Sequence, residues 1–148
     1  MNATATTSLR ETFCTFTLGD LFFGVEVLQV QEVIRHQRMT RVPLAPERIQ
    51  GLMNLRGQIV TALDLGTRLG FARRSHDEAM NVVIRTPDGV VSLLVDEIGD
   101  VVEVNRQQFE PPPDTLQGVS RELIRGAYKL EGRLLLVLDI QKAINEAA

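Results

Sequence analysis

Cysteine and tryptophan are almost absent from this chain of 148 residues. Cys14 is the only cysteine, and there is no tryptophan. A single thiol excludes a disulfide framework and a zinc site built from thiolates. Cys14 lies in the strand-like run Phe13-Cys14-Thr15-Phe16, which predicts a buried and unreactive thiol. The sequence therefore indicates no redox centre.

Long hydrophobic runs are also missing. No apolar run approaches the roughly 18 residues that a membrane-spanning helix needs. Residues 1–10 are polar and threonine-rich, without the basic start and apolar stretch of a signal peptide. We therefore expect a soluble, cytoplasmic protein without direct membrane insertion, in which residues 1–10 form a disordered tail.

The usual signatures of enzymes and metal sites do not occur. The sequence contains no P-loop, no G-x-G-x-x-G, no H-E-x-x-H and no G-x-S-x-G motif. His36 and His76 are the only histidines, and both stand in polar, charged stretches. Too few nitrogen and sulfur ligands remain for a metal, and no nucleophile is placed for a triad. We expect no catalysis, no metal and no cofactor.

Charge gives little support to a nucleic-acid role. The formal net charge is −3, so no broad attraction to phosphate backbones is expected. Arg35, Arg38 and Arg41 form a basic stretch, but aromatic residues on which bases could stack are scarce. A contact with protein or solvent is the preferred interpretation. An RNA-binding tandem barrel and a small β-barrel enzyme or metal-binding domain stay as weaker alternatives.

Short apolar runs separated by glycine-containing turns dominate what is present. They predict four β-hairpins: 12–18 with 21–27, 51–56 with 58–63, 81–86 with 90–95, and 128–130 with 133–138. Only short helices are expected, one over 64–69 and a C-terminal one over 140–146 that Asp139 caps. Pro111-Pro112-Pro113 stops any strand ladder in the connection before the last hairpin.

The chain also repeats itself. Ile49-Gln50-Gly51 and Leu63-Asp64-Leu65 reappear as Ile124-Arg125-Gly126 and Leu138-Asp139-Ile140, each 75 residues later. A hairpin precedes each copy. This pattern predicts two copies of one small β unit, divided near residue 80, and a unit of this size suits a small closed barrel.

Four segments in register resemble the CheW-like coupling proteins of bacterial chemotaxis. They are Phe16-Thr17-Leu18-Gly19-Asp20 with Val30-Gln31-Glu32-Val33, Ile49 to Gly57, Leu93 to Ile98, and Pro111-Pro112-Pro113 with Ile124-Arg125-Gly126. The segment from Ile49 to Gly57 is the most specific. The resemblance covers nearly the whole chain after residue 12.

The resemblance implies a mainly β fold: two small five-stranded SH3-like barrels packed side by side around a shared core. It implies one CheW-like domain over 11–148, with intertwined subdomains of approximately 11–80 and 81–148. It further implies a non-catalytic adaptor recruited to membrane-associated receptor arrays. Its partners would be the regulatory domain of the chemotaxis histidine kinase and the cytoplasmic tip of methyl-accepting receptors. A related pathway, such as pilus-based twitching motility, is the alternative output.

Candidate binding residues follow from these matches. A helical receptor tip would lie in an apolar groove, beside an ion pair of Glu32 with Arg56. The receptor-binding candidates are Val27, Val30, Glu32, Val33, Arg56, Val101 and Val102. The kinase-binding candidates are Gly51, Asn54, Gly57, Gly126 and Gly132.

Overall fold

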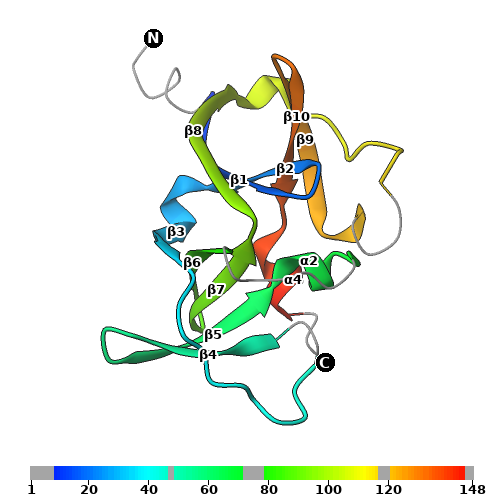
Figure 1. Cartoon of the computed structure of the whole chain (residues 1–148). Coiled ribbons are helices and arrows are strands. Elements are labelled where there is room, and N and C mark those ends of the chain that lie inside the picture. The colour runs from blue at the N-terminus through cyan, green and yellow to red at the C-terminus, as the bar shows by residue number, and fades with distance from the viewer. Residues whose placement is uncertain (1–8, 47–48, 72–78, 117–120, 146–148) are drawn as a thin grey trace.

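Ten strands and four short helical segments make up the part of the chain that the computed structural model describes, residues 9–46, 49–71, 79–116 and 121–145 (Figure 1). The strands are β1 (Arg10–Leu18), β2 (Leu21–Glu26), β3 (Val30–Arg35), β4 (Ile49–Leu55), β5 (Gln58–Asp64), β6 (Met80–Thr86), β7 (Gly89–Val95), β8 (Glu97–Asn105), β9 (Ile124–Leu130) and β10 (Arg133–Leu138). The helical segments are η1 (Val27–Gln29), α2 (Leu65–Arg68), η2 (Arg106–Gln108) and α4 (Ile140–Asn145). The mainly β fold with few helices is confirmed.

All four predicted hairpins are present. They are β1–β2, β4–β5, β6–β7 and β9–β10. In the β4–β5 turn, Arg56 and Gly57 both have positive φ, 53° and 87°, the pattern of a tight two-residue hairpin turn. The predicted tail over residues 1–10 lies mostly outside the described residues, but Arg10 already belongs to β1.

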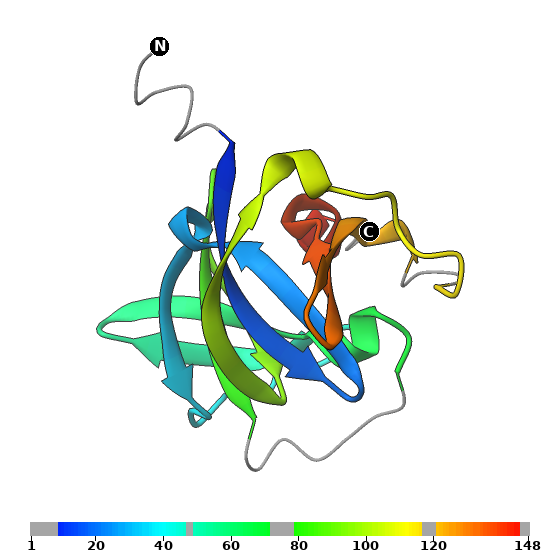
Figure 2. The ribbon, with the colours of Figure 1, turned by 90° about the horizontal axis from the view of Figure 1, so that it is seen from above.

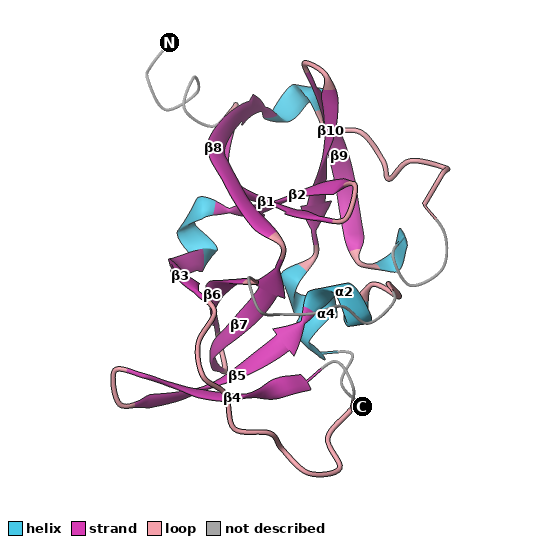
Figure 3. Cartoon of the chain, in the orientation of Figure 1, coloured by secondary structure: helices cyan, strands magenta, loops and turns pink. Residues whose placement is uncertain are grey.

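The strands form two five-stranded sheets (Figure 3). The upper sheet has the order β8-β1-β2-β10-β9, and the lower sheet has the order β3-β6-β7-β5-β4. The β1–β2 hairpin thus lies among strands from the second part of the chain, and the β6–β7 hairpin lies among strands from the first. The predicted subdomains, 11–80 and 81–148, do not coincide with the sheets, because each sheet takes strands from both segments.

The internal repeat is confirmed and extends further than the sequence comparison showed. Leu18 pairs with Leu21 at the first hairpin turn, and Thr86 pairs with Gly89 at the third, 68 residues later (86 − 18). The parallel pair β2–β10 has its counterpart in the parallel pair β7–β5. The strands β1 to β5 therefore correspond to β6 to β10, and the two sheets are equivalent copies.

The two repeated aspartates are structural caps, as predicted. The Asp64 carboxylate accepts a hydrogen bond from the Thr67 amide at 3.2 Å, and that of Asp139 accepts one from the Lys142 amide at 3.0 Å. Each cap satisfies an amide that the first helical turn leaves unpaired. The side chain of Arg68 then donates to the Lys142 carbonyl, which ties α2 to α4, as their neighbouring positions in Figure 1 show.

The expected closure into barrels does not occur through full ladders. Among the described residues, β8 and β9 share no ladder, and neither do β3 and β4. A single bridge replaces each ladder: Glu110 with Ala127 in the upper sheet and Thr40 with Leu52 in the lower. Prolines follow each bridging segment directly or within a few residues. Since proline lacks an amide hydrogen, the pairing cannot extend.

The cores lie inside each sheet and between the two sheets. The shared core between them includes Phe16, Phe23, Val82 and Leu93, all at most 1% exposed. A smaller cluster around Phe13, Tyr128 and Leu135 fills the upper sheet, and one around Met53 and Val60 fills the lower sheet. The shared core predicted between the two units is therefore present.

Gly126 permits the bridge that spans the open side of the upper sheet. A Cβ atom at this position would clash with the Phe109 ring and lie 2.5 Å from the Glu110 carbonyl oxygen. We predict that Gly126→Val lowers the free energy of unfolding by about 1–3 kcal/mol, since overpacking forces the backbone to shift. Urea denaturation measures it. The matched control is Arg125→Val in the same strand, with an expected change within about 0.5 kcal/mol. Equal stability of the two variants would contradict this role.

Candidate functional site

Exposed valines mark the two free edges of the sheets. Among the described residues, β8 pairs only with β1 and β3 only with β6. Val101 on β8 is 60% exposed and Val33 on β3 is 36% exposed. The two occupy equivalent positions in the repeat, because 101 − 33 gives the same offset of 68. We call Val27, Val33 and Val101, together with Cys14, the valine surface.

The elements of this surface are neighbours. Segment η1, which begins at Val27, contacts both β1 and β6, and Figures 1 and 2 show η1 and β3 beside β8. Cys14 on β1 lies directly opposite Val101, so both side chains point to the same face. An apolar strip thus runs across both sheets on one side of the molecule.

Cys14 is half-buried, not fully buried as its sequence context predicted. Its neighbours Phe13 and Thr15 point into the protein, whereas alternation along β1 turns Cys14 the other way. Burial raises the pKa of the Cys14 thiol. The thiol is therefore accessible to reagents yet weakly nucleophilic near neutral pH.

Glu32 and Arg56 form the predicted ion pair beside the valine surface. The Arg56 guanidinium donates to both carboxylate oxygens of Glu32, with Nη2 2.6 Å from Oε1. Such a fork fixes geometry better than a single contact does. The hydrogen bond from Arg56 is the largest cause that lowers the pKa of Glu32, and Glu32 in turn raises the pKa of Arg56. The pair fastens the β4–β5 turn to β3.

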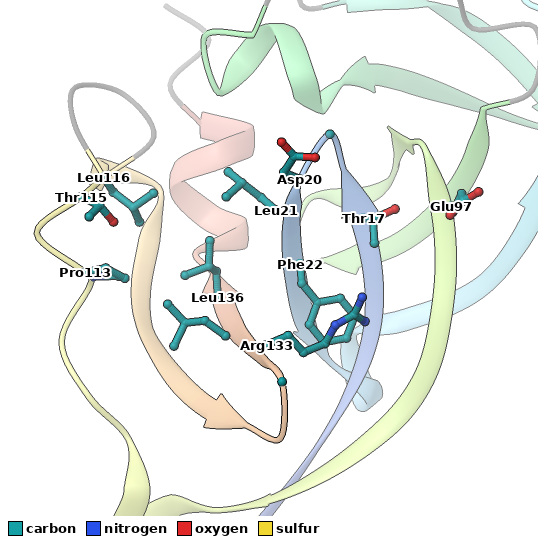
Figure 4. Close-up of a pocket in the computed structure, with 13 residues that line it drawn as sticks. Thr17, Asp20, Leu21, Phe22, Glu97, Pro113, Thr115, Leu116, Arg133 and Leu136 are labelled. Carbon is teal, nitrogen blue, oxygen red and sulfur yellow. The ribbon is translucent and has the colours of Figure 1, made fainter.

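A pocket of about 590 Å³ lies on a different side of the molecule, between the β1–β2 turn, the β9–β10 hairpin and the segment before residue 117 (Figure 4). Leu21, Leu116 and Leu136 contribute apolar wall, and Asp20 stands near the rim. The Arg133 guanidinium carbon lies 4.1 Å from the centre of the Phe22 ring, a cation–π contact. The pocket is apolar with charged edges of both signs.

Two of the predicted receptor-binding valines face the cores. Val102 packs against the cluster inside the upper sheet, and Val30 packs against the shared core. Val102 is the neighbour of the exposed Val101, and adjacent residues on a strand point to opposite faces. Val27, Val33 and Val101 are the valines of the prediction that the structure brings to one surface. Their part in binding stays a prediction.

The five predicted kinase-binding residues do not form one surface. Gly51 and Gly126 are buried beneath the bridging segments. Asn54 and Gly57 lie in the exposed β4–β5 turn, where the Asn54 side chain accepts a hydrogen bond from the Gly57 amide at 2.8 Å. Gly132 lies in the β9–β10 turn and lines the pocket. Gly132 alone among the five is at the pocket.

Sequence reasoning missed Cys14 and the pocket. Cys14 could have been found from alternation, because Phe13 and Val25 frame β1 and β2 as strands with one buried face. The pocket depends on which strands become neighbours: Leu21 and Leu136 come together through the parallel pairing of β2 with β10. No local pattern contains that pairing. The fully exposed Leu44, with φ of 65°, was also missed.

Together, these features are those of a binding module: a duplicated β fold with an apolar strip on one side and a pocket on another. In the described residues no helix is long and apolar enough to span a membrane. Nor do the described His, Cys, Asp and Glu side chains include a group of three or more placed to hold a metal ion.

Comparisons with known proteins agree with this class. A family model described as CheW-like domain matches residues 12–148. A protein named chemotaxis protein CheW from Klebsiella aerogenes is 32% identical over 139 residues, which cover 93% of this chain and 84% of that protein. Its namesake from Bacillus subtilis is 30% identical and covers 97% and 92%. The crystal structure of the scaffolding protein TtCheW from Thermoanaerobacter tengcongensis superposes with a TM-score of 0.82 at 24% identity, covering 90% of this chain and 91% of that one. The chain belongs to the CheW-like domain family.

We predict that Arg56→Ala raises the pKa of Glu32 toward its ordinary value of about 4.3, because the charge-assisted hydrogen bonds are lost. A lowered pKa stabilises the folded state above the unfolded pKa, and this contribution disappears as the pH falls through the folded pKa. The variant should therefore lose less stability than the parent between neutral and acidic pH.

Carboxyl NMR titration of Glu32 measures this shift. Arg125→Ala removes an exposed arginine without a printed link to Glu32 and is the control. The ion pair would have no influence on Glu32 if both variants titrated like the parent protein.

Proposed function

We propose that this protein is a non-catalytic adaptor of bacterial chemotaxis that couples methyl-accepting receptors to the chemotaxis histidine kinase. The observation that carries the proposal is the family match over residues 12–148. The relatives named above are chemotaxis proteins by name, and the structural relative is a scaffolding protein. The adaptor would work in the cytoplasm, at receptor arrays.

The valine surface is the receptor side of this proposal. An amphipathic helix binds by laying its apolar face against apolar side chains. Val33 and Val101 present such side chains from two edge strands without a cover in the described structure. The Glu32–Arg56 pair next to them holds β3 and the β4–β5 turn in place. Its contribution would be orientation.

The pocket is the kinase side of this proposal. Its volume suits one or two apolar side chains of a partner, and the leucines in its wall offer them contact. Arg133 and Asp20 at the edge add charges of opposite sign, which favour one orientation of the partner over others. The position of Gly132 in the same wall agrees with the part predicted for it.

Coupling then requires no chemistry within the adaptor. Receptor and kinase dock on surfaces that share one core, so their relative orientation is set by the fold. A change in the receptor alters the kinase through contacts that differ between its two states. Whether the output is flagellar or pilus-based is decided by the partners.

Cys14 supplies a direct readout of the receptor side. We predict that a receptor-tip fragment, a helical hairpin, slows alkylation of the Cys14 thiol, because the bound helix covers it. Cys14 is the only cysteine, so the label reports on one site. Val101→Asp should weaken the fragment's binding about tenfold or more and abolish the protection.

Arg133→Glu, on the pocket side, is the matched control and should leave protection by the receptor fragment unchanged while weakening the kinase regulatory domain. Titration calorimetry with both partners completes the experiment. Binding of neither partner would refute the proposed function. Binding of the receptor fragment without protection of Cys14 would move the receptor site elsewhere.

A further inference from the structure

The two halves of the chain depend on each other for every ladder except the hairpins. We call residues 9–71 the first half and residues 79–145 the second half. Within the described part of each half, the ladders are the two hairpins, supplemented by one isolated bridge. The remaining ladders, β1–β8, β2–β10, β3–β6 and β5–β7, all join one half to the other.

The cores are divided in the same way. In the shared core, Phe16 and Phe23 come from the first half, and Val82 and Leu93 come from the second. The two smaller clusters also take residues from both halves. A half by itself would keep two separate hairpins, and an isolated hairpin is at best marginally stable in water. The interface between the halves is therefore the interior of the protein.

We propose that each half is a docking surface for the other half of a second copy of this chain, so that the protein has a half-exchanged dimer as a second assembled state. In this dimer the first half of each copy pairs with the second half of the other. Every ladder and every core contact of the monomer is then formed twice, since the described contacts do not distinguish the chain's own half from that of a copy. Exchange of identical elements is a low-cost route to dimers.

Charge placement indicates that unlike halves recognise each other. Arg10 forms an ion pair with Glu103 at 2.7 Å across β1 and β8. Position 103 corresponds to position 35 in the repeat (103 − 68), which is Arg35. A first half paired with another first half would thus bring Arg10 close to Arg35, and like charges repel.

Further polar contacts strengthen this preference. The Tyr128 hydroxyl donates to the Glu11 carboxylate at 3.2 Å, and Arg106 lies 3.5 Å from the same side chain. Both contacts join β1 to the second half. Position 106 corresponds to Arg38 only by number, and no equivalent of Tyr128 exists in the first half, where position 53 is Met53. A copy must therefore supply its second half.

Mixed refolding of full-length variants tests the proposal. Phe16→Asp damages the first half and Leu93→Asp damages the second, since both side chains are fully buried. Each variant alone should lose the native β-sheet signal. Unfolded together in denaturant and refolded, they should recover one intact fold per two chains, in a species with the mass of a dimer, because each supplies the undamaged half that the other lacks.

The matched control is a mixture of Phe16→Asp with Phe23→Asp. Both changes damage the first half, so no undamaged first half exists and no recovery should follow. Where a single variant retains part of its signal, the gain of the mixture over the mean of its components is compared. The proposal is overturned if the Phe16→Asp and Leu93→Asp mixture gains no more than the control mixture while the parent chain refolds under the same conditions.

Discussion

The β1–β2 hairpin is hydrogen-bonded on both of its edges to strands that come more than 70 residues later in the chain, β8 and β10. The β6–β7 hairpin is held in the same way by β3 and β5. Neither sheet can form until the two halves meet, and the shared core fills the space where they do. This reciprocal pairing is the constraint from which the positions of the other features follow.

Both candidate surfaces lie where this pairing ends. β3 and β8 each have one partner among the described strands, so Val33 and Val101 remain at free edges. The pocket forms where β2 and β10 run parallel, which brings the β1–β2 turn beside the β9–β10 hairpin. An adaptor needs two docking sites in fixed relative orientation. A core built from both halves provides this without a hinge between separately folded domains.

The local parts of the fold could be predicted from the sequence, and the nonlocal parts could not. Gly57 and Gly132 fixed two of the hairpin turns, and Asp64 and Asp139 fixed the helix caps, because these features depend on neighbouring residues. The exchange of hairpins depends on pairing between distant strands, which turn residues do not encode. Closed barrels were expected, but the prolines after each bridge prevent long ladders. At the site, the Glu32–Arg56 pair was predicted through the family resemblance, whereas Cys14 needed the register of β1 with β8.

Native-state hydrogen exchange along a denaturant series tests the reciprocal pairing most directly. Amides of β2 and β10 in the upper sheet, and of β5 and β7 in the lower sheet, should open with one common free energy and one common denaturant dependence, because the halves separate only by global unfolding. Opening of the first half at a lower free energy than the second, with the second half still protected, would contradict the account.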